Sequence, residues 1–189
     1  MTNARRRLLL AALSCVAAHA FAQEKPNEKP NPVRSVEITQ SDAGYVANIV
    51  MEAPVPPKIA WDVLTDFGNM EKWVPNVKES RIVTNEGNVL TIEQKGTAKF
   101  GLASFPYTSV RKMELNPQNT ILATQVSGSM RKLVSLMRVT ADGPGTRLDY
   151  RLEIVPGIVA STVMSKDFLK GELTEQFTAI VGEMVRRAK

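Results

Sequence analysis

The chain has 189 residues, of which 43% are apolar and 23% charged, a composition that is ordinary for a globular protein and excludes a largely disordered one. Its length suits one domain with a sizeable core and is short for two full domains. The formal net charge is +5, but Arg5, Arg6 and Arg7 carry part of it, so the charge does not by itself indicate an acidic partner.

Residues 1–22 have the pattern of a secretory signal peptide. Three arginines precede an apolar run over residues 8–18, and Ala20-Phe21-Ala22 forms a small-x-small cleavage site. The run is well short of the roughly 20 apolar residues that a membrane-spanning helix needs. We therefore expect cleavage before Gln23 and a periplasmic or secreted protein, with lipidation of Cys15 and twin-arginine export left open as alternatives.

Removal of this segment changes the chemistry that the rest of the chain offers. The net charge falls to +2, spread along the chain, so we expect no binding of nucleic acid. The only cysteine, Cys15, and the only histidine, His19, are both lost. This loss excludes disulfides, nucleophiles activated by histidine and zinc sites built on Cys or His, and we expect neither a metal nor a cofactor.

The segment that follows is a linker and then the start of a sheet. Residues 23–34 are dominated by Glu, Lys, Asn and Pro, a composition typical of a disordered linker, so we expect the folded domain to span residues 35–189. The pattern becomes strand-like from Ser35. After a turn at residues 41–44, residues 45–52 are predicted to form the first core strand.

Two short helices are predicted after this strand. Pro54, Pro56 and Pro57 end the strand, and proline suits the first turn of a helix because its missing N–H would be unpaired there. Apolar residues then recur at four-residue spacing over residues 59–67, which indicates one buried helical face. Gly68 and Asn69 end this helix before a second short one over residues 70–73.

Residues 77–154 are predicted to form six further strands. Turn-forming clusters at residues 85–88, 116–119, 127–129 and 142–145 divide this stretch at hairpin spacing. In the last strand Leu148, Tyr150 and Leu152 alternate with charged residues, so one face is buried and the other is solvated. A sheet with one solvated face is expected to be antiparallel.

A long amphipathic helix is predicted to end the chain. It follows the break at Pro156 and Gly157, and its apolar residues recur at steps of three to five: Val163, Met164, Phe168, Leu173, Phe177, Ile180, Val181 and Met184. The predicted fold class is therefore α+β, with a curved antiparallel sheet of about seven strands wrapped around the C-terminal helix. Such an arrangement leaves room for a cavity between sheet and helix.

This element order resembles the helix-grip fold of the START-like (SRPBCC) superfamily, which includes polyketide cyclases and coenzyme-Q-binding START-type proteins. The similarity extends over about residues 44–187. It rests on Val55-Pro56 and on the segments WDVLTDF (61–67), MEKWVP (70–75) and GTRLDY (145–150). The resemblance implies an apolar tunnel that holds a lipid, a quinone or a polycyclic aromatic, and it transfers no catalytic residue.

One predicted strand carries the strongest candidates for ligand contact. Over residues 106–115, Tyr107, Arg111 and Met113 share one side with Ser109 and Leu115, and two of these five residues are core-like. This alternation points Arg111 inward. Because a buried guanidinium needs a partner, Arg111 is expected to pair either with an internal carboxylate or with a carboxylate, phosphate or carbonyl of a ligand.

The other candidate ligand-binding residues are apolar or aromatic. Met70 and Trp73 are placed at a cavity mouth, and Tyr150 is expected to offer its hydroxyl to a ligand. Phe168 and Phe177 belong to the apolar face of the long helix. Ordinary core packing is the alternative for each of them.

Three functions fit these observations. The first is an exported carrier that encloses a hydrophobic small molecule and contacts a membrane transiently. The second is a cyclase or aromatase that acts on a polyketide-type substrate in the same cavity, although the sequence shows no recognisable catalytic apparatus. The third is an interaction module whose interior is filled by its own side chains.

Overall fold

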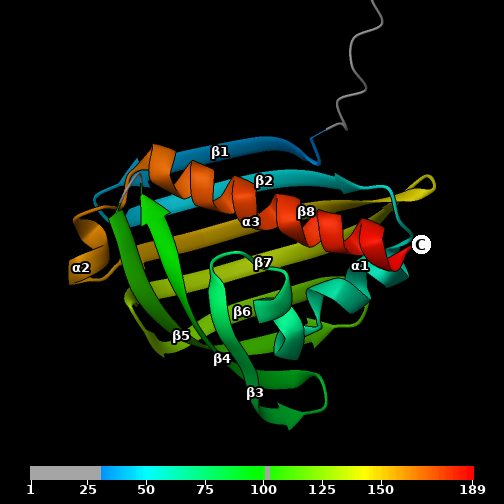
Figure 1. Cartoon of the computed structure of the whole chain (residues 1–189), viewed down its shortest axis with the longest axis horizontal. Coiled ribbons are helices and arrows are strands. Elements are labelled where there is room, and N and C mark those ends of the chain that lie inside the picture. The colour runs from blue at the N-terminus through cyan, green and yellow to red at the C-terminus, as the bar shows by residue number, and fades with distance from the viewer. Residues whose placement is uncertain (1–30, 101–102) are drawn as a thin grey trace, which may run out of the picture. The chain divides into compact units, whose positions relative to one another are not determined.

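One curved antiparallel sheet forms most of the structure (Figure 1). The computed structural model describes residues 31–100 and 103–189, and in it the strand order is β1-β2-β8-β7-β6-β5-β4-β3 with every neighbouring pair antiparallel. The strands are β1 (Val33–Ser41), β2 (Gly44–Ala53), β3 (Val77–Glu86), β4 (Val89–Phe100), β5 (Ala103–Asn116), β6 (Thr120–Gly128), β7 (Met130–Asp142) and β8 (Gly145–Pro156).

Two short helices follow β2, and a long helix ends the chain. They are α1 (Pro57–Leu64), the 3-10 helix η1 (Phe67–Lys72) and α3 (Lys166–Arg187), with the one-turn helix α2 (Ile158–Ser161) just before α3. α1 has proline at its first position, as expected from the missing N–H of that residue. The predicted α+β helix-grip fold is confirmed.

The sheet has one strand more than the seven or so that were predicted. β1 begins at Val33, two residues before the predicted start of the domain, and it pairs with β2 along the edge of the sheet. A shift of register between Val33 and Ser35 interrupts the alternation of inward apolar residues. The strand-like pattern predicted from Ser35 therefore belongs to β1, and the bulge separates it from Val33.

The predicted long helix is divided in the structure. α2 ends at Ser161, and α3 begins only after Ser165, whose side-chain oxygen accepts a hydrogen bond from the backbone N–H of Phe168. This contact satisfies one of the N–H groups that a helix start leaves unpaired. Val163 and Met164 therefore lie in the connection between the helices and not on the face of α3.

The core lies between the concave face of the sheet and the buried side of α3. In β2 each second residue is buried. The buried residues of α3, from Leu169 to Met184, belong to the same core. α3 contacts β1, β2 and α1, and it reaches β4 only near its own N-terminal half (Figure 1). Among the described residues, the backbone of α3 therefore runs closer to β1 and β2 than to β5, β6 and β7.

Two glycines inside α3 are positions where alanine is expected to increase the stability of the fold slightly. A Cβ added at Gly182 would meet no atom within 4 Å, and the same holds for Gly171. Because alanine loses less backbone freedom on folding, Gly182→Ala is expected to raise the free energy of unfolding by about 0.5–1 kcal/mol. Urea denaturation measures the change, with Gly171→Ala as the matched variant. A loss of stability in both variants would contradict the open surroundings of these positions.

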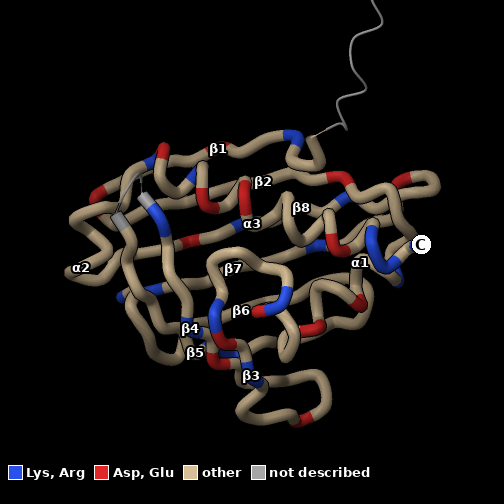
Figure 2. Tube along the Cα trace, viewed as in Figure 1, with Lys and Arg blue, Asp and Glu red and all other residues tan. Residues whose placement is uncertain are grey.

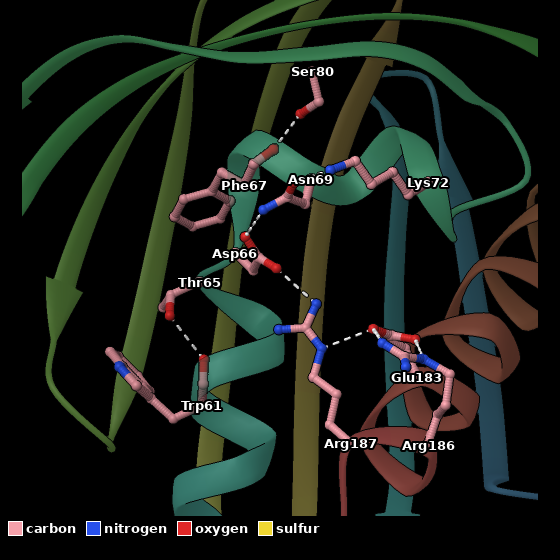
Figure 3. A network of polar contacts seen from close by, with 10 residues as sticks. All are labelled: Trp61, Thr65, Asp66, Phe67, Asn69, Lys72, Ser80, Glu183, Arg186 and Arg187. Atoms are coloured by element: carbon pink, nitrogen blue, oxygen red, sulfur yellow. Dashed lines mark hydrogen bonds and ion pairs between the residues drawn. The ribbon is translucent and has the colours of Figure 1, made fainter.

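A network of charged side chains connects the C-terminal end of α3 to the segment between α1 and η1 (Figure 3). Arg187 lies between two carboxylates, with 2.6 Å from Nη2 to Oδ2 of Asp66 and 2.7 Å from Nε to Oε1 of Glu183. Arg186 donates to both oxygens of Glu183, from Nε to Oε2 and from Nη2 to Oε1, and Asn69 donates to Asp66. The network joins two parts of the chain that are 121 positions apart.

Charges on the outer surface are mixed in sign. Figure 2 shows Lys and Arg interleaved with Asp and Glu along the strands, and ion pairs such as Lys95–Glu79 at 2.8 Å and Lys132–Glu153 at 3.1 Å join neighbouring strands. Within residues 31–100 and 103–189, no helix is both long and apolar enough to cross a membrane. The predicted signal peptide over residues 1–22 lies outside the described residues, as does the predicted linker up to residue 30.

Candidate ligand-binding site

A row of polar side chains crosses the concave face of the sheet. Register places Ser109 opposite Gln94, and it places Arg111 opposite Gln125. The row continues to Tyr150 on β8, whose hydroxyl hydrogen-bonds Ser135 of β7. Because paired residues point to the same side of a sheet, strands β4 to β8 each contribute a polar group to one inward surface.

Arg111 is the only charged member of this row. Its Nη2 donates a short hydrogen bond to Oε1 of Gln94, and its Nε has no hydrogen-bond partner although the atom is buried. Among the described residues no carboxylate lies within ion-pair distance of it. Burial lowers the pKa of Arg111, and the nearby hydroxyls of Tyr150 and Tyr107 act in the opposite direction.

Gln94 is held in the orientation that Arg111 requires. Its Nε2 donates to Oγ of Ser80 at 3.0 Å and contacts Sδ of Met70 at 3.2 Å, which leaves its carbonyl oxygen for the guanidinium. Ser80 in turn donates to the backbone oxygen of Phe67. The polar row is therefore connected to η1, and Met70 contacts it from that side.

Two tyrosines flank Arg111 and are neutral at physiological pH. Burial raises the pKa of Tyr107 to about 12, and its hydroxyl donates to the backbone oxygen of Asn76 at 3.1 Å. Tyr107 lies over Gly96, where a Cβ would come within 2.6 Å of the tyrosine hydroxyl, so the approach requires glycine. Burial also raises the pKa of Tyr150, whose ring meets Phe177 edge-on with centroids 4.8 Å apart.

Arg111 and Tyr150 lie deep in the protein and still keep some accessible surface. Both are surrounded by protein, yet each is only half-buried by accessible area, as are Gln125 and Leu133 on the same face. Their neighbours Met113 and Ser135 are fully buried. Accessible surface at these residues indicates space beside them on the concave face that the neighbouring side chains do not fill.

Three buried polar atoms of the row lack partners in the described part of the chain. They are Nε of Arg111, Oγ of Ser109 and Oε1 of Gln125, on adjacent strands. An unsatisfied buried polar group costs about 1–3 kcal/mol, so a molecule that binds these atoms gains affinity from them.

The sequence-predicted residues do not all meet at this site. Tyr107, Arg111, Met113 and Tyr150 share the concave face, with Phe177 packed on Tyr150. Phe168 is buried at the first turn of α3, well away along the helix. Trp73 instead lines an open hollow of about 330 Å³ on the surface, formed with Glu71, Lys72, Val74 and Lys78, and it lies 6.0 Å from the guanidinium of Arg187.

Sequence reasoning missed Gln94, Gln125 and Ser135. Each is a single polar residue in a strand, where a solvated position is the ordinary interpretation. Alternation along β4 offered a signal for Gln94, because it lies two residues from the buried Ile92. The same alternation along β6 applies to Gln125, which lies two residues from the buried Ala123.

Comparison with known proteins connects this architecture to one family. The sequence model of the family described as polyketide cyclase/dehydrase and lipid transport matches residues 46–187. No curated protein sequence matches the chain.

Several solved structures are similar in fold. The Zhui aromatase/cyclase from Streptomyces sp. R1128 has a TM-score of 0.64 at 17% identity, covering 76% of this chain and 95% of that one. A START superfamily protein from Mycobacterium smegmatis has a TM-score of 0.62 at 16% identity, covering 76% and 99%. A STAR-related lipid transfer protein from Xanthomonas axonopodis has a TM-score of 0.62 at 11% identity, covering 83% and 96%.

Proposed function

Because the chain belongs to the polyketide cyclase/dehydrase and lipid-transport family, whose START-like members bind hydrophobic ligands, we propose that it is an exported carrier of an apolar small molecule. The ligand lies between the concave face of the sheet and α3. Lipids, quinones and polycyclic aromatics are the candidate classes. We propose in addition that the signal peptide is removed before Gln23, that the mature protein is periplasmic or secreted, and that it contacts a membrane transiently to exchange its ligand.

The observation that carries this proposal is the accessible surface of deeply placed inner-face residues. Arg111 and Tyr150 keep accessible area in a part of the molecule that protein surrounds. The rest of that face is largely apolar, with Ile92, Met113 and Met137 buried around it. A mostly apolar lining with a few polar groups that fix orientation is typical of sites for small hydrophobic molecules.

Purification from the periplasm tests the carrier function directly. We expect native mass spectrometry of the full-length gene product, expressed with its own N-terminus, to show a mature chain that begins at Gln23 together with a bound apolar compound. An environment-sensitive apolar dye should bind the emptied protein and be displaced by the extracted compound. A chain that carries no compound and binds no such dye would favour an interior filled by its own side chains and would contradict the carrier function.

A cyclase or aromatase is the second candidate, favoured by the inward placement of Arg111 and Tyr107 and by the likeness to the Zhui enzyme. Arg111 and Tyr107 act as hydrogen-bond donors and do not provide a general base. A phenol with a pKa of about 12 stays protonated at neutral pH, and in the described residues no carboxylate pairs with Arg111. An enzyme of this type would convert an added polyketide-type compound with loss of water, whereas a carrier returns it with unchanged mass.

A further inference from the structure

Arg111 brings a positive charge into the interior without a counter-ion. The groups that face it are Gln94 from β4, Tyr107 and Ser109 from β5, Gln125 from β6 and Tyr150 from β8, and all of them are neutral. Glu172 of α3 acts on Tyr107 but not on Arg111, and its carboxylate contacts Asn76 and the backbone N–H of Lys99. In the part of the chain that the structure describes, nothing acidic balances Arg111.

An uncompensated interior charge is costly, because the ion gives up hydration and gains no partner of opposite sign. The hydrogen bond from Arg111 to Gln94 offsets part of this desolvation cost, but Gln94 is neutral and does not balance the charge. A ligand with one negative charge would offset much more of the cost. The internal charge therefore favours an acidic ligand over a neutral one of the same shape.

The buried atoms that lack hydrogen-bond partners indicate which acidic group the ligand carries. Nε–H of Arg111 is a donor, and the hydroxyl of Ser109, two residues away on the same face, is free to donate. Gln94 occupies only one side of the guanidinium, through Nη2. A carboxylate accepts at two oxygens and carries a single charge, which matches one guanidinium and one hydroxyl. A phosphate carries more charge than this site balances.

Resting on the carrier function proposed above, we propose that the ligand is an amphiphilic carboxylic acid whose carboxylate binds Arg111, with Ser109 as a second donor. Its apolar tail lies along the inner face toward Met113 and Met137. Tyr150 borders the head group and Phe177 holds that tyrosine in place.

A matched pair of ligands tests this proposal. The full mature protein is titrated with a long-chain fatty acid and with the fatty alcohol of the same chain length, each displacing an apolar dye. We expect the acid to bind roughly tenfold to a hundredfold more tightly than the alcohol, the range that a charge-assisted hydrogen-bonded pair provides. Arg111→Met should remove this preference while it retains binding of the alcohol, and Arg111→Lys should keep part of it.

The control is Arg138→Met, an exposed arginine on the same sheet, which should leave the preference unchanged. Equal affinities of the wild type for acid and alcohol would overturn the carboxylate proposal and leave the carrier function standing. Binding of neither compound would overturn the carboxylate proposal, and failure to bind the apolar dye as well would contradict the carrier function. Arg111→Met removes an unbalanced interior charge, so we expect its melting temperature to be no lower than that of the wild type. If this variant fails to fold, the wild-type ratio and Arg111→Lys still decide the outcome.

Discussion

Phe177→Ala is expected to lower the free energy of unfolding by about 3–5 kcal/mol, the usual cost of removing a buried aromatic ring. Phe177 is only 3% exposed, and it lies at the middle of the buried face of α3. Its ring meets Tyr150 with 62° between the planes, an arrangement that adds stabilisation beyond burial of area. The contact holds the long helix against β8 at the candidate site. Urea denaturation followed by circular dichroism measures the loss.

Two further variants serve as controls for the effect of Phe177→Ala. Phe177→Leu keeps most of the apolar volume and should cost about 1 kcal/mol. Thr178→Ala changes the exposed neighbour, and its effect should stay within about 0.5 kcal/mol. If Phe177→Ala cost no more than Thr178→Ala, the ring would border open space and not a packed contact, and the packing described for α3 would be wrong.

Arg187→Met is expected to cost about 2–3 kcal/mol, between the small value of an exposed ion pair and the 3–5 kcal/mol of a buried one. Its side chain is 27% exposed, and it binds Asp66 at 23% and Glu183 at 6% exposure. Its loss leaves the Asp66 carboxylate with Asn69 alone as a hydrogen-bond partner and removes the ion pair between α3 and the residue that precedes η1. The free energy of unfolding at neutral pH measures this cost.

The same network predicts how stability depends on pH. Hydrogen bonds from Arg186, with a further one from Arg187, lower the pKa of Glu183 from 4.5 to about 2 against the effect of burial. Burial acts to raise the pKa of Asp66, but Asn69 and Arg187 outweigh it and the pKa is lowered. Both carboxylates therefore stabilise the fold above their unfolded pKa values, and this contribution is lost as the pH falls from about 4.5 toward about 2.

Arg187→Met should flatten that acid dependence because part of the lowering of both pKa values is lost with the guanidinium. Arg186→Met is the matched variant for stability at neutral pH, because Arg186 binds Glu183 but not Asp66. Arg186 contributes most to the low pKa of Glu183, but its side chain is 70% exposed, so solvent screens it and its removal should lower the free energy of unfolding less than Arg187→Met does. Equal losses in the two variants would show that the link to Asp66 contributes nothing.

Local patterns predicted most of the fold. The alternation in β8 and the apolar stripe of α3 each result from a single element that buries one side, and such periods depend on short-range geometry alone. The prolines before α1 act locally in the same way. β1 was predicted only as a strand-like segment from Ser35 and was not counted as a strand of the sheet, and its bulge interrupts the period between Val33 and Ser35. α3 was predicted to begin too early because the capping contact of Ser165 leaves no mark on apolar spacing.

For the candidate site, the sequence determined that Arg111 points inward, since alternation with Met113 and Tyr107 assigns it a face. Only the tertiary structure decided that Arg111 meets Gln94 and no carboxylate, because this depends on which strands become neighbours and in what register. The same holds for Asp66, whose pairing with Arg187 depends on the packing of α3 against the start of η1. Periodicity is a property of one segment, whereas a partner across 121 positions is selected by the packing of the whole sheet against its helix.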